Sequence, residues 1–154
     1  MEGRESKESN DIFYVCSFID YFARQTKNTR TDTINMLGKK NIEKLYALAD
    51  IYHCQSMEQT MDEFSQVCEV SPGNFDNVAD CDYAVPDYWD IGRVYNNLIM
   101  DIANERPNDD ILDILFEVYN SWITNYIDDY NSNMYYSNPG YIFQSYKNGS
   151  LIAE

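Results

Sequence analysis

The chain has 154 residues, of which 26 are acidic and 11 are basic, and its formal net charge is -15. This charge excludes a general nucleic-acid-packaging protein, because such proteins rely on bulk attraction of positive charge to phosphate. Hydrophobic residues make up 44% of the chain and aromatic residues 15%. That content excludes a disordered chain and predicts a core able to fold without disulfides or metals. The residues show no active site.

The chain ends and the cysteines indicate a reduced cytoplasmic protein. No stretch approaches the roughly 18 consecutive apolar residues of a membrane span, and residues 1–8 are too polar for a secretory signal. We expect residues 1–8 to be a disordered N-terminus. The four cysteines are irregularly spaced and form no C-x-x-C pair. No zinc site or redox motif is therefore expected, and no cofactor is predicted.

The first half of the chain predicts four helices, which form an N-terminal helical subdomain over residues 9–68. Apolar residues at helical spacing predict a helix over 10–25, capped by Ser9 or Asn10. A short helix over 31–38, capped by Thr31, should end at Gly38 in a left-handed conformation. Two more helices are expected at 39–55 and at 56–68. The second of them begins with an S-x-x-Q capping box, Ser56 to Gln59.

Residues 69–86 predict an acidic loop that links the two halves. They contain two prolines, one glycine and no sustained apolar period. The oxygen-rich part of this segment, around Asn77 and Asp80, lacks the residue order of a calcium-binding loop, so we interpret it as solvated. No metal site is expected.

Residues 87–154 predict an acidic, tyrosine-rich helical subdomain. Residues 71–154 hold 3 basic and 14 acidic groups, a net charge of -11, against -4 for residues 1–70. One amphipathic helix should begin after Asp87 and end before Pro107, and a second should run for roughly 20 residues from Asn108. The tail over 138–154 is compatible with a short helix or with a hairpin, and the helical spacing of its aromatic residues favours the helix. The predicted fold is therefore all-α, with about six helices in two packed helical subdomains around one shared or two adjoining cores.

A basic cluster stands out in the otherwise acidic chain. Its order of short helix, glycine and helix over residues 24–53 loosely fits a helix-turn-helix, which makes a DNA-binding regulator one alternative function. The other interpretation is a solvated face that supplies counter-charges to the acidic half. The cluster consists of Arg24, Lys27, Arg30, Lys39, Lys40 and Lys44.

Acidic pairs and late tyrosines together predict a surface for a protein partner. Tyrosine buries area while it keeps a polar tip, which suits interfaces, and the surrounding carboxylates would attract a basic partner. The alternative is that most of these tyrosines complete a small helical core. The predicted contact residues are Asp109, Asp110, Asp113, Asp128, Asp129, Tyr130, Tyr135, Tyr136, Tyr141 and Tyr146.

Residues 9–68 carry a resemblance to a known group of proteins. An aromatic-rich helix from Ile12, a short helix ending at Leu37-Gly38, the stretch Ala49 to His53 and an acidic helix with Glu58 follow one another. This order resembles a family of short uncharacterised bacterial all-helical proteins that are often encoded near toxin-antitoxin cassettes. The resemblance implies an antitoxin-like binding role and no catalytic residues.

These observations predict a non-enzymatic intracellular interaction protein that neutralises or scaffolds a partner. The expected partner is a protein, and a basic protein encoded by a neighbouring gene would fit; nucleic acid is less expected, and no membrane partner is expected. Besides the DNA-binding regulator, the charge allows an acidic mimic of DNA, which would need two roughly parallel rows of carboxylates.

Overall fold

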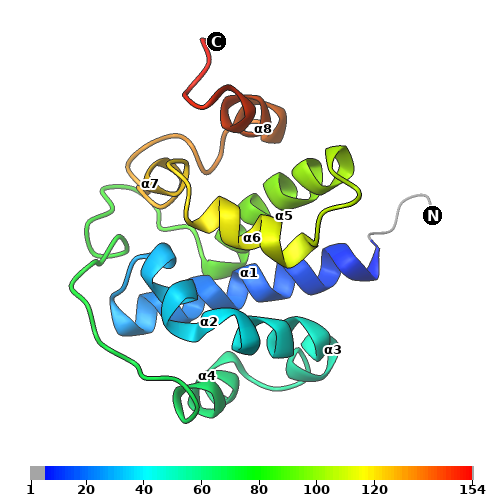
Figure 1. The fold of residues 1–154 in the computed structure, drawn as a ribbon. Coiled ribbons are helices and arrows are strands. Elements are labelled where there is room, and N and C mark those ends of the chain that lie inside the picture. The colour runs from blue at the N-terminus through cyan, green and yellow to red at the C-terminus, as the bar shows by residue number, and fades with distance from the viewer. Residues whose placement is uncertain (1–5, 154) are drawn as a thin grey trace.

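The computed structural model describes residues 6–153, and within them the chain is 62% helix and contains no strand (Figure 1). This confirms the predicted all-α class, and six of the eight helices in this part have seven residues or more. The helices are α1 (Lys7–Thr26), α2 (Arg30–Ala47), α3 (Ala49–Tyr52), α4 (Met57–Ser65), α5 (Tyr88–Glu105), α6 (Ile111–Tyr119), α7 (Thr124–Ile127) and α8 (Pro139–Asn148).

The first helix begins earlier than predicted. Ser6, rather than Ser9 or Asn10, caps α1, because its side-chain oxygen accepts a hydrogen bond of 3.1 Å from the backbone N–H of Ser9. Lys7 and Glu8 are therefore helical, and the prediction of a disordered segment is wrong for them. Residues 1–5 of that predicted segment lie outside the described residues.

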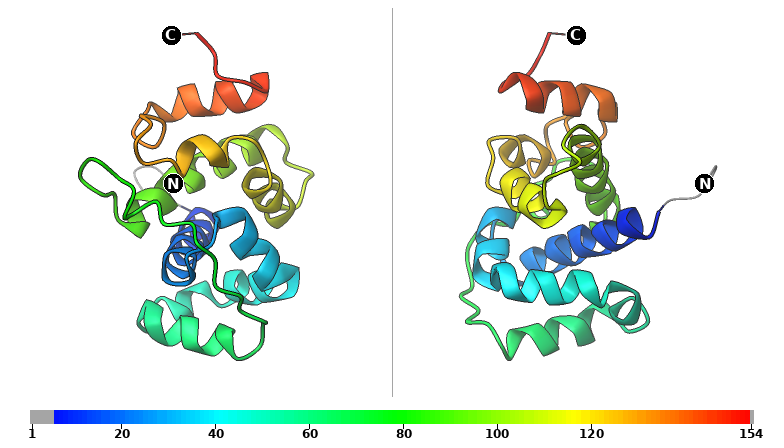
Figure 2. Two further views of the ribbon diagram at one scale, coloured as in Figure 1. Left: turned by 90° about the vertical axis from the view of Figure 1, so that its left-hand side faces the viewer. Right: turned by 45° about the vertical axis from the view of Figure 1, so that its right-hand side comes forward.

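Helix α1 is the central element of the fold. Figure 2 shows it between α8, at one end of the molecule, and α4, at the other. Its apolar residues cover most of its circumference, and Ile12, Val15 and Phe18 are fully buried. A helix that is hydrophobic nearly all round must be covered on several faces. α1 packs against α5 on one side and against α2 on another.

The two halves of the chain share one core. A single cluster of buried hydrophobic side chains includes Phe22 and Ile42 from the first half and Ile99 and Leu115 from the second. Of the two arrangements open from the sequence, one shared core or two adjoining cores, the structure has the first. The contact between α1 and α5 is tight at Gly92, where a Cβ atom would lie 2.0 Å from the Ser17 Oγ.

Helix α2 contains the break predicted at Gly38. Gly38 has φ 82°, which only glycine adopts at low cost, but its ψ of 162° is extended rather than left-handed helical. The chain therefore bends at Gly38 and resumes a helix at once. The cap of α2 is Thr29 rather than the predicted Thr31, and its hydroxyl accepts from the backbone N–H of Asp32 at 3.0 Å.

The predicted helix of about 20 residues from Asn108 is wrong in length and in its cap. Asp110 caps α6, which ends at Tyr119, and only the short α7 follows. The Ser121 hydroxyl donates to the Val118 carbonyl at 2.6 Å, and the Thr31 hydroxyl of α2 donates to the Tyr119 carbonyl. Side chains thus satisfy carbonyls that a continuing helix would have used. The spacing of apolar residues cannot predict a helix end that is set by such hydrogen bonds.

The linker and the tail are as predicted. The loop between α4 and α5 contains no helix and runs along one side of the molecule (Figure 1). The tail forms α8, so the structure has the helix rather than the hairpin. Asn138 caps this helix, and Gly149 ends it in the left-handed conformation with φ 83°. Among the described residues no helix is long and apolar enough to cross a membrane, and the four cysteines are free.

Candidate functional site

A buried ionic network joins α1 to α2. Asp20 is the more deeply buried of the two covered carboxylates on α1, and it accepts hydrogen bonds of 2.8 Å from Arg24 Nε and 2.7 Å from Arg30 Nε. The side chains of Asp20 and Arg30 are each 1% exposed. Burial of a charge is costly unless it is paired and hydrogen-bonded, so this arrangement ties the start of α2 to the middle of the core.

Tyr130 completes this network from the far end of the chain. Its hydroxyl accepts from Arg24 Nη2 at 2.9 Å and from Arg30 Nη2 at 3.0 Å. Tyr130 is 2% exposed, so its predicted place on a partner-binding surface is wrong. The network also shows that the predicted nucleic-acid-binding role is wrong for two residues of the basic cluster. Arg24 and Arg30 are held inside the fold, where they cannot contact DNA.

Asp128 lies beside the network and is also buried, with 5% of its surface exposed. Tyr95 donates to its Oδ1 at 2.7 Å, and the Asn77 side chain donates to its backbone carbonyl at 2.8 Å. Burial raises the pKa of Asp128 to about 7, although the Arg30 guanidinium opposes this shift. The prediction of Asp128 as an exposed contact residue is wrong, because the turn after α7 directs it inward.

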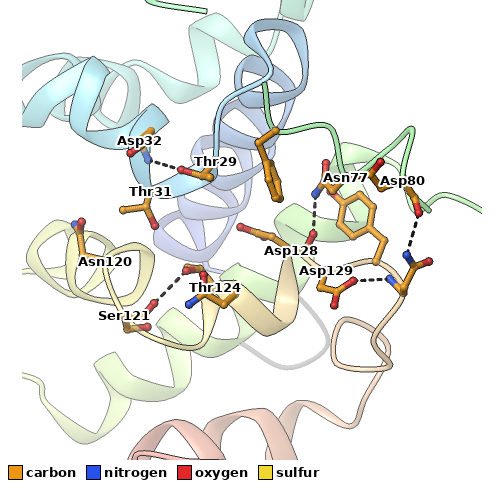
Figure 3. Close-up of a pocket in the computed structure, with 14 residues that line it drawn as sticks. Thr29, Thr31, Asp32, Asn77, Asp80, Asn120, Ser121, Thr124, Asp128 and Asp129 are labelled. Carbon is orange, nitrogen blue, oxygen red and sulfur yellow. Dashed lines mark hydrogen bonds between the residues drawn. The ribbon is translucent and has the colours of Figure 1, made fainter. Parts of the chain in front are cut away.

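A polar cavity of about 510 Å³ lies over this network. Three separate segments form it: the start of α2, the loop before α5, and the stretch from the end of α6 to the turn after α7 (Figure 3). Its lining contains four carboxylates, eight Asn, Ser and Thr side chains, and two aromatic residues. The lining residues are Thr29, Thr31, Asp32, Phe75, Asn77, Asp80, Asn120, Ser121, Thr124, Asn125, Asp128, Asp129, Tyr130 and Asn131.

The sequence did not predict this cavity. Asn77 and Asp80 belong to the segment that the sequence predicts as a solvated loop, and nothing in their spacing connects them to Thr29 or Asp128. The only signal was the concentration of Asn, Asp and Thr in three segments without apolar period. Within residues 6–153 no group of three or more His, Cys, Asp or Glu side chains is arranged to hold a metal ion.

The lysines of the basic cluster are divided between ion pairs and solvent. Lys27 pairs with Asp76 at 3.1 Å, and Lys39 pairs with Asp113. Lys40 and Lys44 are exposed on α2. This distribution matches the predicted alternative in which the cluster supplies local counter-charges.

The predicted partner-binding acids do not form one surface with the tyrosines. Asp109 and Asp113 lie near the α5–α6 turn, where they pair with Arg106 and Lys39. Asp110 caps α6 in the same region. Tyr146 also belongs here, since its hydroxyl bonds the Glu117 carboxylate. Asp129, in contrast, lies at the polar cavity.

The other predicted tyrosines lie together on a hollowed surface. We define the tyrosine surface as Tyr83, Tyr135, Tyr136 and Tyr141. Three hollows of about 300, 440 and 180 Å³ meet at Tyr136, which lines all of them. Tyr136 is 70% exposed and Tyr83 69% exposed. Tyr83 was not among the predicted residues, because it lies in the linker.

Comparison of the chain with protein-family models, with curated proteins and with solved structures gives no match. The function proposed below therefore rests on the residues and their geometry.

Asp128 makes the stability of the fold depend on pH. An unfolded aspartate titrates near pH ~3.9, whereas burial raises the pKa of folded Asp128 to about 7. Between these values the folded chain holds a proton that the unfolded chain has lost, so the contribution of Asp128 to the free energy of unfolding falls as the pH rises. The charged and titratable groups that act on it are Arg30, Asp20, Tyr95 and Arg24.

We expect Asp128→Asn to remove this dependence. Relative to the wild type, the variant should gain stability between pH ~4 and pH ~7, by on the order of 3 kcal/mol. Urea denaturation of both proteins at several pH values measures the difference directly, and other titrating groups cancel. Parallel stability curves for the two proteins would contradict the raised pKa of Asp128.

Proposed function

We propose that this protein is a non-enzymatic interaction protein that binds a basic protein partner through the tyrosine surface. It acts as a neutraliser of that partner, as an antitoxin does, or as a scaffold for it. Three observations support the proposal: the net charge of the chain, the pairing of its basic side chains within the fold, and the exposure of large aromatic rings around hollows.

The observation that carries the proposal is the internal use of the basic side chains. Of the ten Lys and Arg residues in the described part of the chain, seven form ion pairs with carboxylates. Two more lie over aromatic rings, Lys44 at 5.9 Å from the Phe64 ring and Arg93 at 4.0 Å from the Phe13 ring. Few basic side chains therefore remain available to a partner, on a chain whose net charge is -15. Such a surface attracts basic partners and repels acidic ones.

The tyrosine surface offers the anchoring positions that an interface needs. Interfaces derive much of their binding energy from aromatic anchors in well-packed pockets. Tyr136 lies where three hollows meet, and Asp90 and Arg93 line one of them beside Val94. Asp82 is exposed in the linker next to Tyr83. The neighbouring carboxylates favour lysine or arginine side chains around the aromatic contact.

The test is co-purification with a tagged chain expressed in its native cells, followed by mass spectrometry at moderate salt. We expect one stoichiometric basic protein with the wild type. The double variant Tyr83→Ala/Tyr136→Ala should recover at least ~10-fold less, because it removes two exposed anchors. Raising the salt should weaken the complex.

Matched controls separate the tyrosine surface from general charge. Tyr126→Ala removes a tyrosine that is 41% exposed on α7, outside the tyrosine surface. Asp82→Lys and Asp109→Lys introduce the same charge at two separate places. Only Asp82→Lys should slow association with the partner. Equal recovery of the partner with Tyr83→Ala/Tyr136→Ala, or recovery of nucleic acid alone, would refute the proposal.

A further inference from the structure

The polar cavity has acceptors in excess and contains no cationic side chain. Its lining includes Asp32, Asp80, Asp128 and Asp129 but no lysine, arginine or histidine. Arg30 lies behind the cavity wall, where its Nε and Nη2 bond Asp20 and Tyr130.

We define the rim of the cavity by the carboxylates of Asp32, Asp80 and Asp129. No neighbouring basic side chain neutralises them. Asp20 forms ion pairs with both Arg24 and Arg30, and the charge of Asp128 acts on Arg30 as well. None of the ion pairs within residues 6–153 includes Asp32, Asp80 or Asp129. The rim therefore carries three uncompensated carboxylates around one opening.

Asp128 adds a buried carboxylate that is aimed into this opening. Figure 3 shows its side chain pointing into the space between Thr29 and Thr124. Oδ1 accepts from Tyr95, whereas Oδ2 accepts no hydrogen bond from the described residues. Oδ2 is not among the buried polar atoms that lack a partner, and a donor group of a ligand in the cavity can bond it. The phenyl ring of Phe75 also lines the cavity, and the Arg30 guanidinium carbon lies 6.0 Å from its centre.

We propose that this cavity binds an organic cation, a primary ammonium or guanidinium group, with Asp128 at its base and Asp32 and Asp129 at its rim. The space of about 510 Å³ suits an organic group rather than a bare metal ion. Two sources share this chemistry: a free amine, and a lysine or arginine side chain of a protein. The proposal does not depend on the tyrosine surface.

The test is calorimetric titration of the full chain at pH 8, where Asp128 is ionised, with n-butylammonium, n-butylguanidinium and the uncharged 1-butanol. We expect both cations to bind with a stoichiometry of one, and 1-butanol not to bind. Asp128→Asn should weaken cation binding at least ~10-fold, which corresponds to about 1.4 kcal/mol. The rim variant Asp32→Asn/Asp129→Asn leaves the buried network intact and should weaken binding several-fold, with a smaller salt dependence.

The control variant is Asp62→Asn, which neutralises an exposed acid on α4, and it should bind like the wild type. If Asp128→Asn does not fold, the rim variant still decides the question. Equal binding of 1-butanol, absence of binding by both cations, or unchanged binding in the rim variant would overturn the proposal.

The two sources are distinguished with a capped lysine, N-acetyl-lysine-N-methylamide. If it binds as tightly as n-butylammonium, the cavity accepts a side chain of a protein. If only the small amines bind, the ligand is a free amine.

Discussion

Asp20→Asn is expected to destabilise the fold by about 3–5 kcal/mol, because it leaves two buried guanidinium groups without their shared carboxylate. Asp20 bonds Arg24 and Arg30 at 2.8 and 2.7 Å, and the side chains of Asp20 and Arg30 are each 1% exposed. Domains of this kind are stable by only about 5–15 kcal/mol. Urea denaturation followed by circular dichroism measures the loss.

The matched control for this experiment is Asp109→Asn, the same change in an ion pair at the surface. Asp109 bonds Arg106 at 2.7 Å, but its side chain is 47% exposed. Exposed pairs contribute little, since water and salt replace the lost partner. The two sites differ in burial and in what remains after the change, because Arg106 keeps its ion pair with Glu117 whereas Arg24 and Arg30 both lose Asp20. A comparably small effect of Asp20→Asn would show that the network is not a main source of stability.

The helices could be predicted from the sequence because their causes are local. The apolar spacing along α1 and α5, the capping oxygen of Ser56 and the positive φ of Gly38 depend on residues within a few positions of one another. Each of these features reappears in the structure. The buried stop after Tyr119 depends instead on Thr31, which is distant in sequence. Local patterns carry no trace of such a contact.

The network and the cavity could not be predicted for the same reason. Asp20 and Tyr130 are joined through Arg24 and Arg30 across more than a hundred positions of the chain. In the sequence, an isolated acid on an apolar helix and a tyrosine near the end carry no sign of their pairing. Tyr130 and Asp128 therefore looked like members of an exposed acidic surface. Burial is decided by tertiary packing, which residue type alone does not encode.

The buried charges also explain why one core serves both halves. Arg30 comes from the first half of the chain and Tyr130 from the second. The hydrogen bond of 3.0 Å between them therefore joins residues that precede and follow the linker in the sequence. The Arg24 Nη2 also donates to the Pro86 carbonyl at 2.7 Å. These directional bonds fix the position of the linker, while the contact of α1 with α5 buries apolar surface.

Gly92→Ala is expected to destabilise the fold by about 3 kcal/mol or more, because the added methyl group has no room between α1 and α5. Its Cβ would lie 2.0 Å from the Ser17 Oγ, 2.8 Å from the Ser17 backbone N and 2.9 Å from the Ser17 Cα. The last two atoms belong to the backbone, so a side-chain rotation cannot relieve the clash and the helices must separate.

Two variants make the origin of this effect testable by urea denaturation. Gly140→Ala places a methyl group in the first turn of α8, where its Cβ would meet only the Asn138 Oδ1, at 3.0 Å. It should change stability little, since alanine is the better helix former and the neighbouring side chain can move. Ser17→Gly combined with Gly92→Ala removes the whole Ser17 side chain but retains the backbone contacts, so it should recover only part of the loss. Full recovery in that double variant would show that the Ser17 side chain alone sets the distance between α1 and α5, whereas unchanged stability of Gly92→Ala would show that the two helices are not held at this spacing.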